Sequence, residues 1–237
     1  MGRWHGRIHS LQDSGNAGVI YPERDPARCH AGEPRPCNFA VAGWADTESR
    51  VATPLETWVE ESSRLTKPDQ IVFCDGSESE YHRMIENLLA EGDTLALSEK
   101  TFPNCHLHRS SVNDVARTEH LTFICTPEKD DAGPTNNWMD PDAAKHKLGA
   151  LFNGAMRGRT MYVVPYIMGP VHSPISKVGV EITDSPYVVA SMRIMTRMGD
   201  VALKKLGSSA KFVPGLHSLG DLDPTRRYIV HFPQERL

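Results

Sequence analysis

The sequence lacks the short motifs by which many nucleotide-dependent enzymes are recognised. Its 237 residues contain neither a GxxxxGK[ST] phosphate loop nor a GxGxxG dinucleotide-binding loop. No serine stands in a GxSxG elbow, so a nucleophilic triad is equally unsupported. The chain as given therefore shows no means of holding a nucleoside triphosphate.

Long apolar runs and excess positive charge are also missing. No stretch approaches the roughly 20 residues that span a bilayer, and no apolar core of a secretory signal follows Arg3 and Arg7. The formal net charge of −4 gives no electrostatic reason to expect nucleic acid or an anionic membrane. Because 39% of the residues are hydrophobic and 24% are charged, we expect a soluble globular protein.

Cysteine is scarce and irregularly spaced. The five cysteines are Cys29, Cys37, Cys74, Cys105 and Cys125. Their odd number and the absence of CxxC spacing argue against a zinc site or a disulfide framework. The pair His106 and His108 could hold a metal from one face of a strand, but no third ligand follows at motif spacing, so we interpret it as an exposed polar loop. A reducing, cytoplasmic location is expected.

Residues 1–52 differ from the rest of the chain. They are rich in Gly, Pro, Arg and Asp, and four prolines would interrupt any helix there: Pro22, Pro26, Pro34 and Pro36. Their composition offers too little apolar surface to offset the entropy of ordering. A disordered or non-native leader is therefore favoured over a folded extension, and the ordered domain is expected to span residues 53–237.

From Thr53 onward the sequence alternates between helical and strand patterns. Thr53 and Ser77 each stand three residues before a glutamate, which is the spacing of a capping box. Helices are expected from residues 54, 78, 141 and 186 (the last running to Arg197), and strands at 71–74, 94–97, 121–125, 160–167, 178–183 and 228–232, with a polar loop at 127–137. This order predicts an α/β domain with a mixed sheet.

Four ordered runs carry a family resemblance. They are Ile71–Tyr81, Asp114–Glu119 (DVARTE), Asp131–Met139 (DAGPTNNWM) and, most informative, Gly158–Gly199. Together they resemble the N-terminal portion of the GTP-dependent phosphoenolpyruvate carboxykinases, from about Thr53 to Leu237. Residues 1–52 are not covered.

The resemblance implies a reaction: oxaloacetate and GTP give phosphoenolpyruvate, GDP and carbon dioxide, as a step of gluconeogenesis. It implies Mn²⁺ or Mg²⁺ as cofactor, GTP as substrate and a monomeric full-length enzyme. In the family, the metal ligands and the phosphate loop follow the point at which this chain ends. We therefore expect a fragment that is inactive alone and exposes an apolar patch where the missing part docks.

Arg117 is the one substrate-binding residue that the resemblance assigns. In the family the arginine of DVAR contacts the carboxylate of oxaloacetate or phosphoenolpyruvate. A guanidinium is always charged and can bind a carboxylate with two parallel hydrogen bonds. Without the resemblance, an ion pair with Asp114 or Glu119 would be favoured. No catalytic, cofactor-binding or metal-binding residue is predicted.

Two further interpretations stay open. A second basic set could line an anion-binding cleft or simply be solvated: Arg157, Arg159, Arg193 and Arg197. The alternative to a carboxykinase fragment is a stand-alone, non-catalytic module that binds a dicarboxylate through Arg117.

Overall fold

A computed structural model describes residues 52–109, 119–209, 211–223 and 225–237. Its helices are α1 (Pro54–Thr66), α2 (Glu78–Ala90), α3 (Pro141–Phe152), α4 (Pro186–Met195) and α5 (Asp200–Leu206), with short 3₁₀ turns η2 (Glu119–Leu121) and η3 (Lys129–Ala132). Its strands are β1 (Gln70–Phe73), β2 (Thr94–Ala96), β3 (His106–His108), β4 (Thr122–Ile124), β5 (Asn137–Trp138), β6 (Thr160–Met168), β7 (Lys177–Thr183), β8 (Arg197–Met198), β9 (Val213–Leu216) and β10 (Ile229–His231).

The main sheet confirms the predicted mixed orientation. Its strands follow the order β1-β6-β7-β9, with β1 parallel to β6, β7 antiparallel to β6 and β9 parallel to β7. Strand β1 pairs with β6 only as far as Val163, and β8 then pairs antiparallel with Tyr166 and Ile167. Two short strands therefore share one edge of β6.

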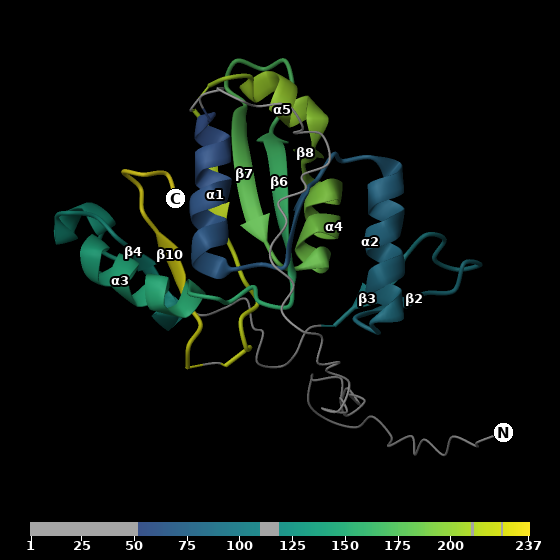
Figure 1. Ribbon diagram of the computed structural model, residues 1–237, viewed down its shortest axis with the longest axis horizontal. Coiled ribbons are helices and arrows are strands. Elements are labelled where there is room, and N and C mark those ends of the chain that lie inside the picture. The colour runs from purple at the N-terminus through teal and green to yellow at the C-terminus, as the bar shows by residue number, and fades with distance from the viewer. Residues whose placement is uncertain (1–51, 110–118, 210, 224) are drawn as a thin grey trace. The chain divides into compact units, whose positions relative to one another are not determined.

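Helices cover both faces of this sheet. Alternate residues of β6 and β7 face opposite ways, so each face presents its own apolar side chains to the helices that cover it. One face packs Val163, Ile167, Val180 and Ile182 against α1 and α5. Figure 1 shows how the helices are arranged around β6 and β7. The other face packs Tyr162 and other residues of β6 against α2 and α4. Burial on both faces explains the long apolar run of β6.

A second, smaller sheet has the order β10-β4-β5, with both pairings parallel. Its buried cluster joins Cys125, Phe232 and Ala144 of α3. The predicted C-terminal strand thus finds its partner, β4, within the chain. Strands β2 and β3 form a separate antiparallel hairpin.

Local signals determine the starts of the first two helices in different ways. Thr53 and Glu56 make the predicted reciprocal capping box of α1. Ser77 caps α2 as predicted, but the Glu80 carboxylate accepts from the backbone N–H groups of Asp75 and Gly76 instead of closing the box on Ser77. The Ser77 N–H already donates to the Asp75 carboxylate, 2.7 Å away.

Three of the expected elements are corrected. The helix expected to reach Arg197 ends at Met195, because Arg197 and Met198 form β8 on the free edge of β6. The segment around His106 is strand β3, since it pairs with β2. The expected polar loop at 127–137 includes the 3₁₀ turn η3, and its last residue is the first residue of β5, which pairs with β4. Elements α5 and β9 were not predicted.

Candidate functional site

The DVAR segment lies outside the described residues. Arg117 is therefore not placed, and its role stays a prediction. The next described residue is Glu119, in the 3₁₀ turn η2 that leads directly into β4. Strand β4 pairs with β10.

A buried carboxylate organises the chain at the end of β7. Asp184 is 5% exposed, and its oxygens accept hydrogen bonds from the Ser218 hydroxyl (2.8 Å) and the Leu219 N–H (2.9 Å). Arg159 forms an ion pair with the same carboxylate at 2.8 Å and donates to the Gly220 carbonyl at 2.6 Å. The segment after β9 is thereby fixed against the beginning of β6.

A histidine lies beside this anchor. The Nδ1 atom of His217 lies 2.8 Å from the Thr183 hydroxyl oxygen, which also accepts from the Ser185 N–H. Since Ser185 caps α4, the histidine and the helix start are linked through one hydroxyl group. His217 thus belongs to a separate set of hydrogen bonds, next to Asp184 in the chain through Thr183 and Ser185.

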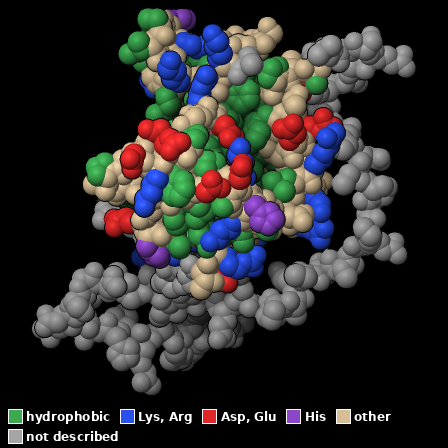
Figure 2. Space-filling model, turned by 90° about the vertical axis from the view of Figure 1, so that its left-hand side faces the viewer, with side chains coloured by type: hydrophobic (Ala, Val, Ile, Leu, Met, Phe, Trp, Pro, Cys, Tyr) green, Lys and Arg blue, Asp and Glu red, His purple; other side chains and the backbone are tan. Residues whose placement is uncertain are grey.

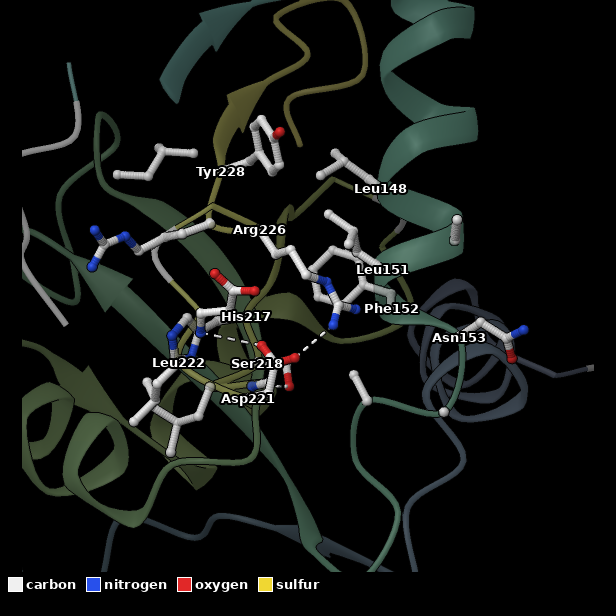
Figure 3. Close-up of a pocket in the computed structure, with 18 residues that line it drawn as sticks. Leu148, Leu151, Phe152, Asn153, His217, Ser218, Asp221, Leu222, Arg226 and Tyr228 are labelled. Carbon is white, nitrogen blue, oxygen red and sulfur yellow. Dashed lines mark hydrogen bonds and ion pairs between the residues drawn. The ribbon is translucent and has the colours of Figure 1, made fainter. Parts of the chain in front are cut away.

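Beside this network lies a pocket of about 560 Å³. One wall is the C-terminal part of α3, and the other is the segment between β9 and β10 (Figure 3). Leu148, Leu151 and Phe152 give it an apolar side, and His217 and Ser218 give it a polar side. An apolar pocket with a few convergent polar groups is the usual form of a small-molecule site.

Two adjacent arginines line the pocket in different electrostatic states. Arg226 is exposed and forms an ion pair with Asp221 at 2.6 Å (Figure 3). Arg227 is partly buried, and its Nε and Nη1 atoms are inaccessible to solvent and have no hydrogen-bond partner in the described structure. The two residues therefore offer a matched comparison of a paired and an unpaired guanidinium.

The second basic set does not form a single cleft. Arg159 precedes β6 and is engaged by Asp184, whereas Arg197 pairs with the opposite end of β6. At about 3.3 Å per residue these ends are roughly 25 Å apart. Arg193 donates to the Glu78 carboxylate at 2.5 Å. The anion-lined cleft considered for these residues is therefore wrong for the set as a whole.

One histidine of the pair, His108, has a structural role. The Nδ1 atom of His108 lies 2.7 Å from the Asp93 carbonyl oxygen, and the ring stacks on Tyr187 with 3.7 Å between centroids. Within the described ranges, no three His, Cys, Asp or Glu residues gather in a way that could hold a metal ion. This part of the chain thus does not fit the Mn²⁺ or Mg²⁺ that the resemblance implies.

None of the described helices is long and apolar enough to cross a membrane.

The described fold belongs to the α/β class, with a mixed sheet that helices cover on both faces. Residues 57–237 match the family described as the phosphoenolpyruvate carboxykinase N-terminal domain, and the chain belongs to this family. The predicted resemblance is confirmed.

Curated relatives agree with this assignment. A protein of Anaeromyxobacter sp. (strain K) named phosphoenolpyruvate carboxykinase (GTP) is 57% identical over 178 residues, which cover 75% of this chain and 30% of the relative. Proteins of the same name from Corynebacterium jeikeium (strain K411) and Chlamydia pneumoniae are 50% and 48% identical over 207 and 193 residues, covering 83% and 76% of this chain and 34% and 32% of the relatives. The chain thus spans about a third of the length of these relatives. The stand-alone binding module is not favoured.

Sequence reasoning missed most of the described site. Asp184 and Ser218 carry no motif, because their importance comes from contacts between segments more than 30 residues apart. The one local signal was Arg226-Arg227 directly before an expected strand. That signal does not reveal which arginine is paired.

Proposed function

We propose that this chain is the N-terminal part of a GTP-dependent phosphoenolpyruvate carboxykinase, acting in gluconeogenesis in the cytoplasm. The whole enzyme would convert oxaloacetate and GTP into phosphoenolpyruvate, GDP and carbon dioxide. The family match over residues 57–237 is the observation that carries this proposal. The names of relatives at 48–57% identity support it.

Within that enzyme, we propose that Arg117 binds the substrate carboxylate. Its planar guanidinium can hold both carboxylate oxygens and so fix the orientation of the keto acid. Lysine would keep the charge but lose the two parallel hydrogen bonds. No step is assigned to a metal ion, because the described residues do not fit one. We further propose that the 237-residue chain alone does not turn over substrate.

The proposal is tested by calorimetric titration of the 237-residue chain with oxalate and with phosphoenolpyruvate. Replacement Arg117→Lys is expected to weaken binding about tenfold, which corresponds to the loss of one charge-assisted hydrogen bond. The matched control is Arg64→Lys, since Arg64 is an exposed residue of α1 whose ion pair within the described ranges is with Glu60. Equal affinities of the parent and Arg117→Lys would refute the role of Arg117.

A second titration tests inactivity of the isolated chain. GTP and Mn²⁺ are added separately and together, and phosphoenolpyruvate production from oxaloacetate is assayed in parallel. We expect no turnover and no saturable binding of either at micromolar concentration. Detectable turnover would show that the chain carries its own nucleotide site.

A further inference from the structure

Helix α4 is apolar on more sides than the described chain covers. Its sequence, PYVVASMRIM, contains one charged residue, Arg193, which forms an ion pair with α2. Val189 and Met192 pack on the sheet. Other large side chains stay accessible, with Ile194 74% and Met195 67% exposed. A helix that is apolar all round is normally buried, so one face of α4 lacks a partner within the described residues.

This uncovered face includes the side of α4 that points away from α2. Successive residues of an α-helix are rotated by about 100°. Val189 and Met192 give the direction of the sheet, and Arg193 gives the direction of α2. On the same helix Val188 and Met195 lie roughly opposite Arg193, so they point along the sheet and away from α2.

The sheet continues on that side of α4. Met84 of α2 shares a buried cluster with Cys74, which follows β1, so α2 covers the β1 side. Val164 of β6 lies under α4 in the same cluster, Glu181 of β7 pairs with Val164, and Gly215 of β9 pairs with Glu181. Paired residues share one face of a sheet, so β7 and β9 extend the face beyond α4.

The width of this extension suits one more helix. Neighbouring strands lie about 4.8 Å apart, so β7 and β9 add roughly 10 Å, which is close to the spacing of about 8–10 Å between packed helices. The remaining described helices pack elsewhere, α1 and α5 on the opposite face and α3 on the small sheet. A helix beside α4 is therefore the element that the layer lacks within the described ranges.

An acid without a counter-charge lies on the same strip of the sheet. Glu181 is partly buried, its carboxylate lies against Gly215, and burial raises the pKa of the carboxyl to about 7. Within the described residues no hydrogen bond or ion pair reaches this carboxylate. Its oxygens are nevertheless not among the unpartnered polar atoms that solvent cannot reach. A partly buried carboxylate is best matched by a basic side chain, since a charge without a partner is costly to cover.

We propose that this side of the domain is a docking site for an amphipathic helix that carries a lysine or arginine opposite Glu181. The docking site, named the α4 surface, consists of Val188, Ser191 and Met195 on α4 and Glu181 and Gly215 on the sheet. The occupant is a segment of the longer enzyme, because the part that matches this chain makes up only 30% of the Anaeromyxobacter relative. The inference rests on the proposed function for the existence of that segment, and it locates the apolar docking face that the resemblance implies.

The test uses a full-length chimera, in which this chain replaces the 178 matched residues of the protein of Anaeromyxobacter sp. (strain K). Met195→Cys reports on the α4 surface. Leu95→Cys is the matched control, because Leu95 is also exposed (58%) but lies in the β2–β3 hairpin. The rate of alkylation by N-ethylmaleimide is measured at each position by mass spectrometry, in the 237-residue chain and in the chimera. We expect the rate at position 195 to be about tenfold lower or less in the chimera, and the rate at position 95 to stay within about twofold.

Glu181→Gln gives an independent readout, whose sign differs between the two chains. At pH 8 it should raise the Tm of the 237-residue chain, because an uncharged amide replaces a carboxylate without a partner. In the chimera it should lower the Tm, because the basic side chain of the docked helix loses its partner. The control Glu60→Gln, on the exposed side of α1, should change either Tm by less than about 1 °C.

Three results with the folded chimera overturn the inference. They are an unchanged rate at position 195, equal slowing at positions 95 and 195, and Tm shifts of the same sign in the two chains. Protection of position 195 that rises with the concentration of the 237-residue chain alone identifies a second copy as the occupant, which also overturns it.

A chimera that does not fold is replaced by co-expression of the 237-residue chain with the remaining residues of the relative. The same alkylation rates are then measured in the complex, and absence of a complex overturns the inference. Phosphoenolpyruvate production by the chimera reports on the proposed function, whereas the rate at position 195 reports on the α4 surface. Failure of one is therefore distinguishable from failure of the other.

Discussion

Asp184 binds two residues that line the pocket, Ser218 and Leu219. Its buried carboxylate accepts from Ser218 and Leu219 and pairs with Arg159. Asp184→Ala would leave these donors without their acceptor, so we expect a loss of about 3 kcal/mol in the free energy of unfolding. Urea denaturation measures this loss.

The matched control for that prediction is Asp221→Ala. Asp221 also pairs with an arginine, Arg226, but both side chains are more than half exposed. The expected loss is below about 1 kcal/mol, because solvent screens such a pair. Similar losses in the two variants would show that the Asp184 network does not carry the stability assigned to it.

Glu181 predicts a pH dependence of stability. It is partly buried on β7, its carboxylate lies against Gly215 of β9, and burial raises the pKa of the Glu181 carboxyl to about 7. The pKa of Glu181 is higher in the folded chain than in the unfolded one. Its contribution to the free energy of unfolding is therefore fully present below about pH 4.5 and is lost as the pH rises through about 7.

The variant Glu181→Gln isolates this effect. Glutamine cannot ionise, so it should stabilise the chain by roughly 2 kcal/mol at pH 8 relative to the parent and much less at pH 5. Urea denaturation at the two pH values gives the difference. A difference that does not change with pH would contradict the raised pKa.

At the scale of elements, the chain after β1 contacts the residue before α5 so closely that only glycine fits at position 199. Gly199 has a φ of 87°, and a Cβ there would overlap the carbonyl oxygen of Asp75. The Asp200 N–H donates to that same carbonyl. We expect Gly199→Ala to destabilise the chain by more than about 3 kcal/mol, because backbone on both sides must move.

Gly207, at the other end of α5, is the control for that substitution. Its φ is 56°, but a methyl group added at this position would meet nothing within 4 Å among the described residues. Because Gly207 (ψ −133°) and Gly199 (ψ −139°) share a backbone region that other residues rarely adopt, Gly207→Ala should cost about 1–3 kcal/mol from backbone strain alone, less than Gly199→Ala. Thermal denaturation compares the two variants. Equal shifts in Tm would mean that the close approach at Gly199 is not the source of the cost.

The elements differ in how far the sequence could predict them. Helix α1 was predicted with its cap because the Thr53–Glu56 signal is local. Strand β9 was missed because Val213–Leu216 contains Pro214 and Gly215 and has no alternating pattern; its extended form comes from pairing with β7. Likewise, Arg227 could be seen in the sequence, but its lack of a partner depends on tertiary contacts.

At the scale of the whole molecule, the expected apolar docking face stays a prediction. Large exposed hydrophobic side chains include Ile175 (81% exposed), Ile194 (74%) and Met195 (67%). Figure 2 shows the side that carries α3, β4 and β10, where hydrophobic side chains lie exposed among acidic and basic ones. The relatives extend well beyond the part that matches this chain, and their additional residues could cover such surfaces.

The expected boundary at Thr53 gives the last prediction. Every residue of the three buried clusters in the described structure comes after Thr53, and Thr53 itself caps the first helix. A chain starting at Ala52 should therefore unfold cooperatively, with a Tm within about 2 °C of the parent, which is less than about 1 kcal/mol for a domain of this size. Calorimetry of the two chains makes the comparison. A Tm lowered by more than about 5 °C would mean that residues 1–51 contribute to the folded domain, and the boundary would have to move toward the N-terminus.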